Sequence, residues 1–176
     1  MDAQLRSHLS SLLPRLRRFA LGLTGSRDEG DDLVQATYER AIAHIGQWEA
    51  GTRLDSWMYR IMRNTHLNVL RGRKVRGTLV DPKDAEEALG VDARPGLEAR
   101  LTLAKVRQCI DRLPEDQKAI LMLVCVEGQT YDEAAATLEL PLGTVTSRLA
   151  RARTALRAMM EGGPRAEPPA EPGAGR

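Results

Sequence analysis

The chain has 176 residues, enough for one domain or two small ones, and its formal net charge of +2 excludes a general polycation. Aromatic residues make up 3% of the chain while Leu, Ala, Arg and Glu are plentiful, which favours packed helices over sheets. No apolar run approaches the ~20 residues of a membrane span and no signal-peptide core is present, so we expect a cytoplasmic protein without membrane insertion.

The cysteines and histidines form no ligand set. Cys109 and Cys125 each lie in an apolar helical run, without a second ligand at zinc spacing. His8, His44 and His66 are scattered along the chain. We therefore expect two buried, reduced thiols, no metal site and no cofactor.

The first helix is predicted within residues 5–23, where apolar residues recur at helical spacing. Pro14 falls inside this run and suits a first turn, with Ser10 or Ser11 near the cap. The Thr-Gly-Ser sequence at 24–26 is expected to end the helix.

A second helix begins near Arg27, with acids in its first turn that complement the helix dipole. Its apolar stripe consists of Leu33, Thr37, Ala41 and Ile45. Its other faces carry an acidic surface formed by Asp31, Asp32, Gln35 and Glu39.

A third helix is predicted from Leu54 to Leu70, after a break that holds Trp48. Thr52 and Asp55 have capping-box spacing at its start. Its apolar side consists of Leu54, Trp57, Met58, Ile61 and Met62. Its basic side and end carry Arg60, Arg63, Asn64, Asn68, Arg71, Arg73, Lys74 and Arg76, close to Trp57 and Tyr59. Cations beside aromatics and amides are typical of surfaces that bind unpaired bases; the alternative is a solvated helix end whose cations complement the dipole.

The helical pattern stops in the stretch after this basic helix. Residues 77–95 are rich in acids, Pro and Gly, and we interpret them as a flexible acidic linker between two domains. Helical spacing resumes near Leu97, and Pro114 opens a further helix that Gly128 ends. After Glu161 the chain is Pro, Gly, Ala and Glu, a composition that predicts disorder.

Two helices joined by a tight turn are predicted between Gln129 and Arg157. Thr130 and Glu133 have capping-box spacing before the first, and Pro141 suits the first position of the second. Glu139 stands in the turn where such motifs often have Gly, so we expect a turn conformation that does not need Gly. Ala134 and Leu138 lie on one face, Leu138 and Leu140 bracket the turn, and Val145 and Leu149 are expected to face the core. Ala134 and Ala135 are small where the two helices are expected to cross closely.

This pattern is that of a helix-turn-helix, whose second helix enters the DNA major groove. No acid occurs between Pro141 and Met160, and short hydroxyls and arginines suit phosphates and guanine edges. The residues assigned to DNA contact are Gly143, Thr144, Thr146, Ser147, Arg148, Arg151 and Arg153. The alternative is an ordinary helical hairpin with a solvated basic face.

Two stretches resemble the sigma factors of bacterial RNA polymerase, in particular the small two-domain extracytoplasmic-function (ECF) group. The first resembles sigma region 2 and reads DDLVQATYERA, a break, and LDSWMYRIMRNTHLNVLRGRK; the second resembles region 4 and reads LPEDQKAILMLVCVEGQTYDEAAATLELPLGTVTSRLARARTAL. The resemblance implies an all-α fold with two small domains at 1–77 and 97–161, a linker at 78–96 and a disordered tail at 162–176.

The resemblance also implies roles for particular residues. The acidic helix would dock on core polymerase through Asp31, Asp32, Leu33, Gln35 and Glu39. The basic helix would read the minus-ten element through Trp57, Arg60, Arg63, Asn64, Asn68 and Arg71, with Asn64 where this group holds a flipped base. The helix-turn-helix would read the minus-thirty-five element as duplex. In this group an anti-sigma factor is an expected partner, so the protein would be a monomer or a heterodimer with it.

The expected function is promoter-specific transcription initiation in a stress or envelope response, with no active site in the chain itself. One alternative is a sigma-like decoy that binds an anti-sigma factor, although it would not need a basic recognition helix. Another is a helix-turn-helix regulator that dimerises through the first domain, which would need a symmetric apolar face. An enzyme acting on nucleic acid would need paired carboxylates at metal spacing, which the sequence lacks.

Overall fold

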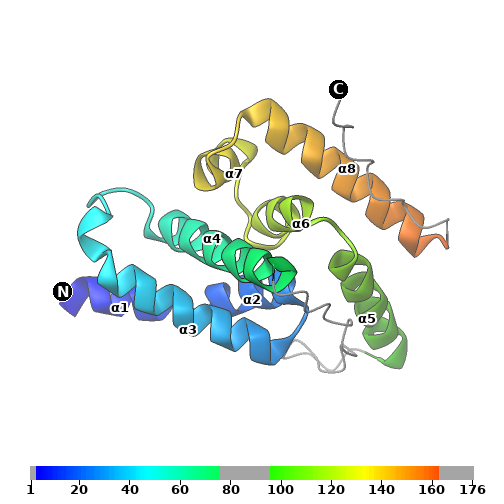
Figure 1. Ribbon diagram of the computed structural model, residues 1–176. Coiled ribbons are helices and arrows are strands. Elements are labelled where there is room, and N and C mark those ends of the chain that lie inside the picture. Colours follow the sequence, from blue (N-terminus) through cyan, green and yellow to red (C-terminus); the bar gives the residue numbers. More distant parts are fainter. Residues whose placement is uncertain (1–2, 76–95, 163–176) are drawn as a thin grey trace.

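The computed structural model describes residues 3–75 and 96–162, without the side chains of Leu97 and Glu98. Within these ranges all regular structure is helical, which confirms the predicted all-α fold (Figure 1). The first group of elements is α1 (Ala3–Ser11), α2 (Leu13–Thr24), α3 (Arg27–Ala43), the 3-10 turn η1 (Ile45–Gln47) and α4 (Leu54–Val75). The second group is α5 (Leu97–Asp111), α6 (Glu115–Leu121), the π turn η2 (Met122–Val126), α7 (Tyr131–Leu138) and α8 (Leu142–Met160). The predicted flexible linker and disordered tail lie almost entirely outside the described residues.

In the first group, α2, α3 and α4 pack around one apolar core. Leu16, Phe19 and Leu23 of α2 and Met58 and Met62 of α4 are buried there. Gly25 ends α2 in the left-handed conformation (φ 69°), and Ser26 caps α3 by accepting from the Glu29 amide, so the predicted helix boundary is confirmed.

Two predicted caps in this group are wrong. Residues 5–23 form two helices, and the hydroxyls of Ser10 and Ser11 donate to carbonyls of their own helix rather than capping α2. Leu12 stands at the α2 N-cap with a helical backbone, so the break is too slight to need a serine cap. Thr52 donates to the Glu49 carbonyl and does not pair with Asp55 in a capping box.

In the second group, α7 and α8 form the predicted helix-turn-helix against α6. The Thr130–Glu133 capping box is confirmed. The Thr130 hydroxyl accepts from the Glu133 amide at 3.2 Å, and the Glu133 carboxylate accepts from the Thr130 amide at 2.8 Å. Pro141 stands at the N-cap of α8, one residue earlier than predicted.

The expectations for Glu139 and Cys125 are wrong. Glu139 adopts φ 55° and ψ 45°, the same left-handed conformation that Gly takes in such turns. Cys109 is buried as expected, but Cys125 is exposed because it lies on the outer side of η2 beside Arg153.

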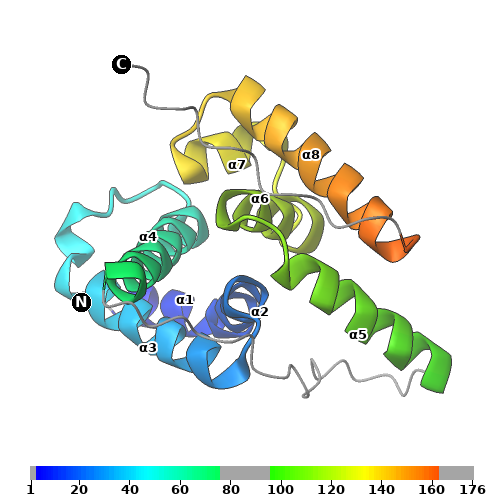
Figure 2. The same cartoon turned by 45° about the vertical axis from the view of Figure 1, so that its right-hand side comes forward.

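The two groups share an interface, with α2 against α5, α6 and η2, and α4 against α7 (Figure 2). A Cβ at Gly22 would overlap the Met122 side chain, so Gly22 allows α2 and η2 to approach closely. Lys118 is almost fully buried and donates to the Leu23 carbonyl of the other group at 3.2 Å. None of the described helices has the length and apolar character needed to cross a bilayer.

Candidate nucleic-acid and polymerase interfaces

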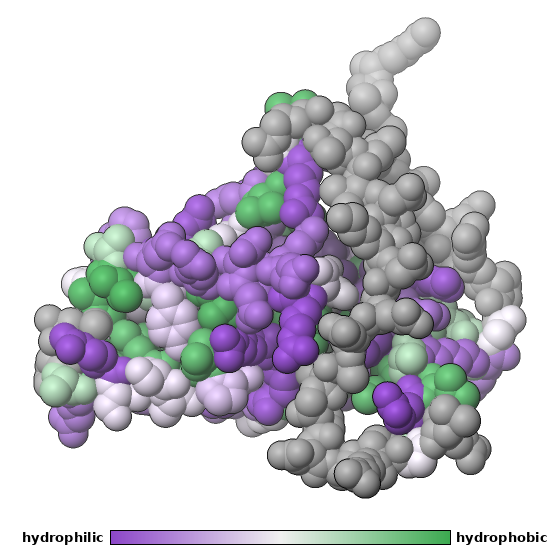
Figure 3. All heavy atoms as spheres, turned by 90° about the horizontal axis from the view of Figure 1, so that it is seen from below, coloured by the Kyte–Doolittle hydropathy of each residue, from purple (hydrophilic) through white to green (hydrophobic). Residues whose placement is uncertain are grey.

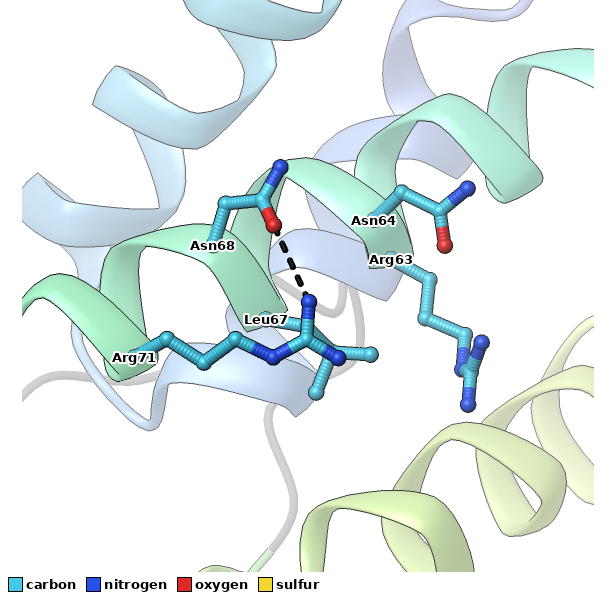
Figure 4. A pocket seen from close by; sticks show the side chains of 5 residues that line it. All are labelled: Arg63, Asn64, Leu67, Asn68 and Arg71. Carbon is cyan, nitrogen blue, oxygen red and sulfur yellow. Dashed lines mark hydrogen bonds between the residues drawn. The ribbon is translucent and has the colours of Figure 1, made fainter.

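An open hollow of about 360 Å³ lies along α4 and is lined by Arg63, Asn64, Leu67, Asn68 and Arg71 (Figure 4). Asn64 and Asn68 are exposed and lie one turn apart, and the Asn68 side-chain oxygen accepts from Arg71 at 3.2 Å. Amides flanked by guanidinium groups can donate to base edges and to phosphates. Four of the residues assigned to the minus-ten element, Arg63, Asn64, Asn68 and Arg71, therefore lie together.

Three of the six residues assigned to this element, Trp57, Arg60 and Arg63, are less accessible than the two amides. Arg60 extends to the other group of helices, where its Nη1 donates to Glu139 at 2.6 Å. Trp57 is half-buried against the core. Arg63 points away from the two amides towards α6, and its burial, together with the nearby charge of Arg148, lowers its pKa (Figure 4).

Tyr59, which sequence reasoning treated as part of a base-stacking surface, is only 1% exposed. Its ring packs against Phe19 with a centroid distance of 4.8 Å. Tyr59 is therefore a core residue and offers no face on which a base could stack.

The helix α8 buries Val145, Leu149 and Ala152 and leaves a polar face outward. Among the residues assigned to DNA, Gly143, Thr146, Ser147, Arg151 and Arg153 are exposed, while Thr144 and Arg148 are half-buried.

The three arginines of this face point in different directions. Arg148 and Arg153 are five residues apart and so lie roughly 140° apart around the helix. Arg148 pairs with Asp116 at 3.1 Å, whereas Arg153 contacts the Tyr131 hydroxyl at 3.3 Å. Within the described residues, Arg151 donates only to the carbonyl of Ser147 one turn earlier, at 3.4 Å. Of the three, Arg151 is the guanidinium most available to a duplex.

The helix α3 presents an acidic face in which Asp31, Asp32, Gln35 and Glu39 are all exposed. Arg17 pairs with Asp31 at 3.2 Å, and Gln35 donates to Glu39 at 3.1 Å. Seen from below, the molecule shows a broad hydrophilic area in the region of α3, the helix along the lower left of Figure 1 (Figure 3). Leu33 was assigned to the same surface, but it is 6% exposed and packs in the core, so it supports the helix from behind.

Sequence reasoning missed a buried ionic cluster between the two groups of helices. The Glu127 side chain is fully buried and accepts from Arg15 at 3.0 Å, Arg18 at 3.2 Å and the Tyr59 hydroxyl at 2.6 Å. Burial, followed by the hydrogen bond to Glu127 and its charge, raises the pKa of Tyr59 above its usual range. One signal was available, because an acid just before the Gly that ends a helix opposes the helix dipole.

The chain matches known families at both groups of helices. Residues 9–63 match the family model described as the Sigma2 domain of PhyR, and residues 103–156 match that of sigma-70 region 4. The ECF RNA polymerase sigma factor EcfG of Rhodopseudomonas palustris is 37% identical over 156 residues, or 89% of this chain and 84% of that protein. The ECF RNA polymerase sigma factor SigE of Mycolicibacterium smegmatis is 32% identical over 89% of this chain and 60% of that protein.

The solved structure of the sigma factor RpoE of Bartonella quintana, in complex with the anti-sigma factor NepR, is similar to this one. The TM-score is 0.73 at 30% identity, covering 91% of this chain and 98% of that one. The chain belongs to the ECF sigma factors of RNA polymerase.

Proposed function

We propose that this chain docks on core RNA polymerase through the exposed acidic face of α3 and reads a two-part promoter. The observation that carries the proposal is that one chain combines an amide-and-guanidinium hollow on α4 with an exposed, acid-free face on α8. The first suits single-stranded bases and backbone, and the second suits the major groove of a duplex.

The roles of individual residues follow from their exposure. Asn64 would hold an unstacked base of the minus-ten element, while Asn68 and Arg71 steady the backbone. Ser147 and Arg151 would meet the minus-thirty-five duplex. The chain would carry no active site of its own, and it would act in the cytoplasm, where the polymerase synthesises RNA.

An anti-sigma factor is the second partner that we propose. It is supported by the RpoE structure of B. quintana, which is that of a complex with the anti-sigma factor NepR. Alone, the chain would be a monomer, and with this partner a heterodimer held inactive until a stress or envelope signal releases it.

A decoy that only binds an anti-sigma factor is the second candidate function. The match of residues 9–63 to the Sigma2 domain of PhyR favours it, because PhyR of B. quintana is an anti-anti-sigma factor, solved in complex with the anti-sigma factor NepR. The acid-free face of α8 argues against it, since a decoy has no need to attract DNA phosphates.

Transcription by purified core polymerase, with and without this chain, on fragmented genomic DNA separates the two candidates. Discrete transcript starts that share two upstream elements would establish an initiation factor and reveal its promoter. An absence of stimulation, together with tight binding to an anti-sigma factor, would favour the decoy.

The docking surface has its own test. Asp32→Lys should weaken binding to core polymerase at least about tenfold, since it places a cation in an acidic contact surface. Asp132→Lys makes the same charge change at the exposed start of α7 and should have little effect on core binding. Equal losses for the two variants would mean that α3 is not the docking surface.

A further inference from the structure

The buried Glu127 cluster joins the two sigma domains directly. Glu127 follows η2 in the second domain, whereas Arg15 and Arg18 lie on α2 and Tyr59 on α4 of the first. Three side chains of one domain thus donate to one carboxylate of the other. The Glu127 side chain has no exposed surface, so the contact forms only when the domains are together.

The same interface holds residues that we assign to promoter DNA. Arg60 is paired across the interface with Glu139 of the helix-turn-helix turn, whereas Arg148 is paired with Asp116 of its own domain. Arg63 is half-buried near Arg148, and this burial and the like charge lower its pKa. Two guanidinium groups meant for different promoter elements are therefore brought together, whereas DNA would need them apart.

We propose that this closed arrangement is a self-blocked state of the free chain, in which Glu127 is the latch that keeps Arg60 and Arg63 from promoter DNA. The inference rests on the proposed function for the DNA roles of these arginines. Opening the interface frees them, and core polymerase, which presents the two promoter elements far apart, selects the open state.

Glu127 is the latch because the other pairs between an arginine and a carboxylate across the interface are exposed to solvent. The side chains of Arg60 and Glu139 are 38% and 64% exposed, and those of Arg53 and Glu133 are 45% and 36% exposed. Exposed pairs contribute little to stability, whereas a buried carboxylate left without partners is strongly unfavourable. Among the arginine–carboxylate pairs between the domains, those of Glu127 therefore contribute most to holding the domains together.

Two variants with opposite charge changes test the latch. Glu127→Gln adds one positive charge and Arg15→Gln removes one, and both remove the Arg15–Glu127 ion pair. If the latch closes the molecule, both variants of the full chain should show a larger radius of gyration by small-angle X-ray scattering, with unchanged helix content. This measurement needs neither polymerase nor DNA, so it does not depend on the proposed function.

The second readout is binding of the free chain to the promoter fragment found by mapping transcript starts. Both variants should bind it at least about threefold more tightly than wild type, because the fraction of open chain rises. Charge alone predicts weaker binding for Arg15→Gln, so tighter binding by that variant identifies the latch. The matched controls, Glu161→Gln and Arg6→Gln at exposed sites, should change binding by less than about twofold and leave the radius of gyration unaltered.

Each other outcome overturns part of the proposal. An unchanged radius of gyration in both variants would mean that Glu127 is no latch. Expansion without tighter DNA binding would mean that the closed state does not block the DNA surfaces. If no promoter is found, the proposed function fails by its own experiment while the scattering result stands.

Discussion

Arg60 of α4 donates at 2.6 Å to the carboxylate of Glu139, whose own backbone is left-handed at φ 55° and ψ 45°. A residue with a Cβ is disfavoured in this conformation by about 1–2 kcal/mol, whereas Gly is not. The ion pair is largely exposed and contributes at most about 1 kcal/mol. The pair therefore does not offset the backbone strain of the helix-turn-helix turn.

The first prediction concerns this strain. Glu139→Gly and Glu139→Ala both remove the carboxylate, but only Gly relieves the left-handed backbone. The Gly variant should be more stable than the Ala variant by about 1 kcal/mol in urea unfolding. Equal stability of the two variants would show that the turn is relaxed with any residue.

The second prediction ranks the arginines of α8. Arg151 has no acidic partner in the described part of the chain, whereas Arg148 is paired with Asp116. Arg151→Ala should weaken binding to a minus-thirty-five duplex and reduce the slope of log K against log salt by about one. Arg6→Ala, an equal charge change on α1, should leave that slope unaltered. If the two variants give the same slope, Arg151 makes no phosphate contact.

Periodicity and capping chemistry predicted most of the elements. The Thr130–Glu133 box and the stripe of Val145 and Leu149 located α7 and α8, because these are local signals that tertiary contacts leave in place. The serine cap at α2 was wrong because its break keeps a helical backbone, which side-chain identity does not reveal. The expectation for Glu139 was wrong because the left-handed conformation disfavours a residue with a Cβ by only about 1–2 kcal/mol, which packing can override.

The candidate site was predictable only in part. Exposure of Asp31, Asn64 and Arg151 followed from helical phase relative to the core. The Glu127 cluster was not predictable, because Glu127 lies 112 positions from Arg15 and 68 from Tyr59, and no local pattern links them. Leu33 was assigned to the surface by resemblance to a motif, although its place in the apolar stripe pointed to the core.

The third prediction tests base capture by α4. Asn64→Ala should reduce promoter opening, measured by permanganate reactivity of unpaired thymines, by about tenfold or more, because a flipped base loses its hydrogen-bond partner. Binding of the variant to core polymerase should stay near wild type, since Asn64 lies on α4 and not on the acidic face of α3.

The matched control for this variant is Gln108→Ala, which removes an exposed amide from α5, outside the hollow. It should leave both promoter opening and core binding unaltered. If Asn64→Ala instead lowers core binding as much as promoter opening, Asn64 contacts the polymerase or maintains the fold rather than holding a base.

The last prediction concerns acid and the contact between α4 and α6. The Glu115 carboxylate lies 2.9 Å from Nε2 of His66 and accepts from Lys118 at 2.9 Å. Burial acts to raise the pKa of Glu115, but the hydrogen bonds and charges of His66 and Lys118 outweigh burial and hold the pKa below its usual 4.5. A carboxylate with a lowered folded-state pKa stabilises the fold above its unfolded pKa and loses that contribution as pH falls through the folded value.

Glu115→Gln should therefore be less stable than wild type at neutral pH, and the difference should shrink as the pH falls below 4.5 and the wild-type carboxyl becomes protonated. Urea midpoints measured across this range give the difference at each pH. Glu161→Gln, at an exposed site after α8, should match wild type throughout. Because the Asp55 carboxylate, whose pKa is also lowered, titrates in all three proteins, only the difference between Glu115→Gln and wild type reports on Glu115. A difference that stays constant with pH would mean that Glu115 acts through packing and not through its charge.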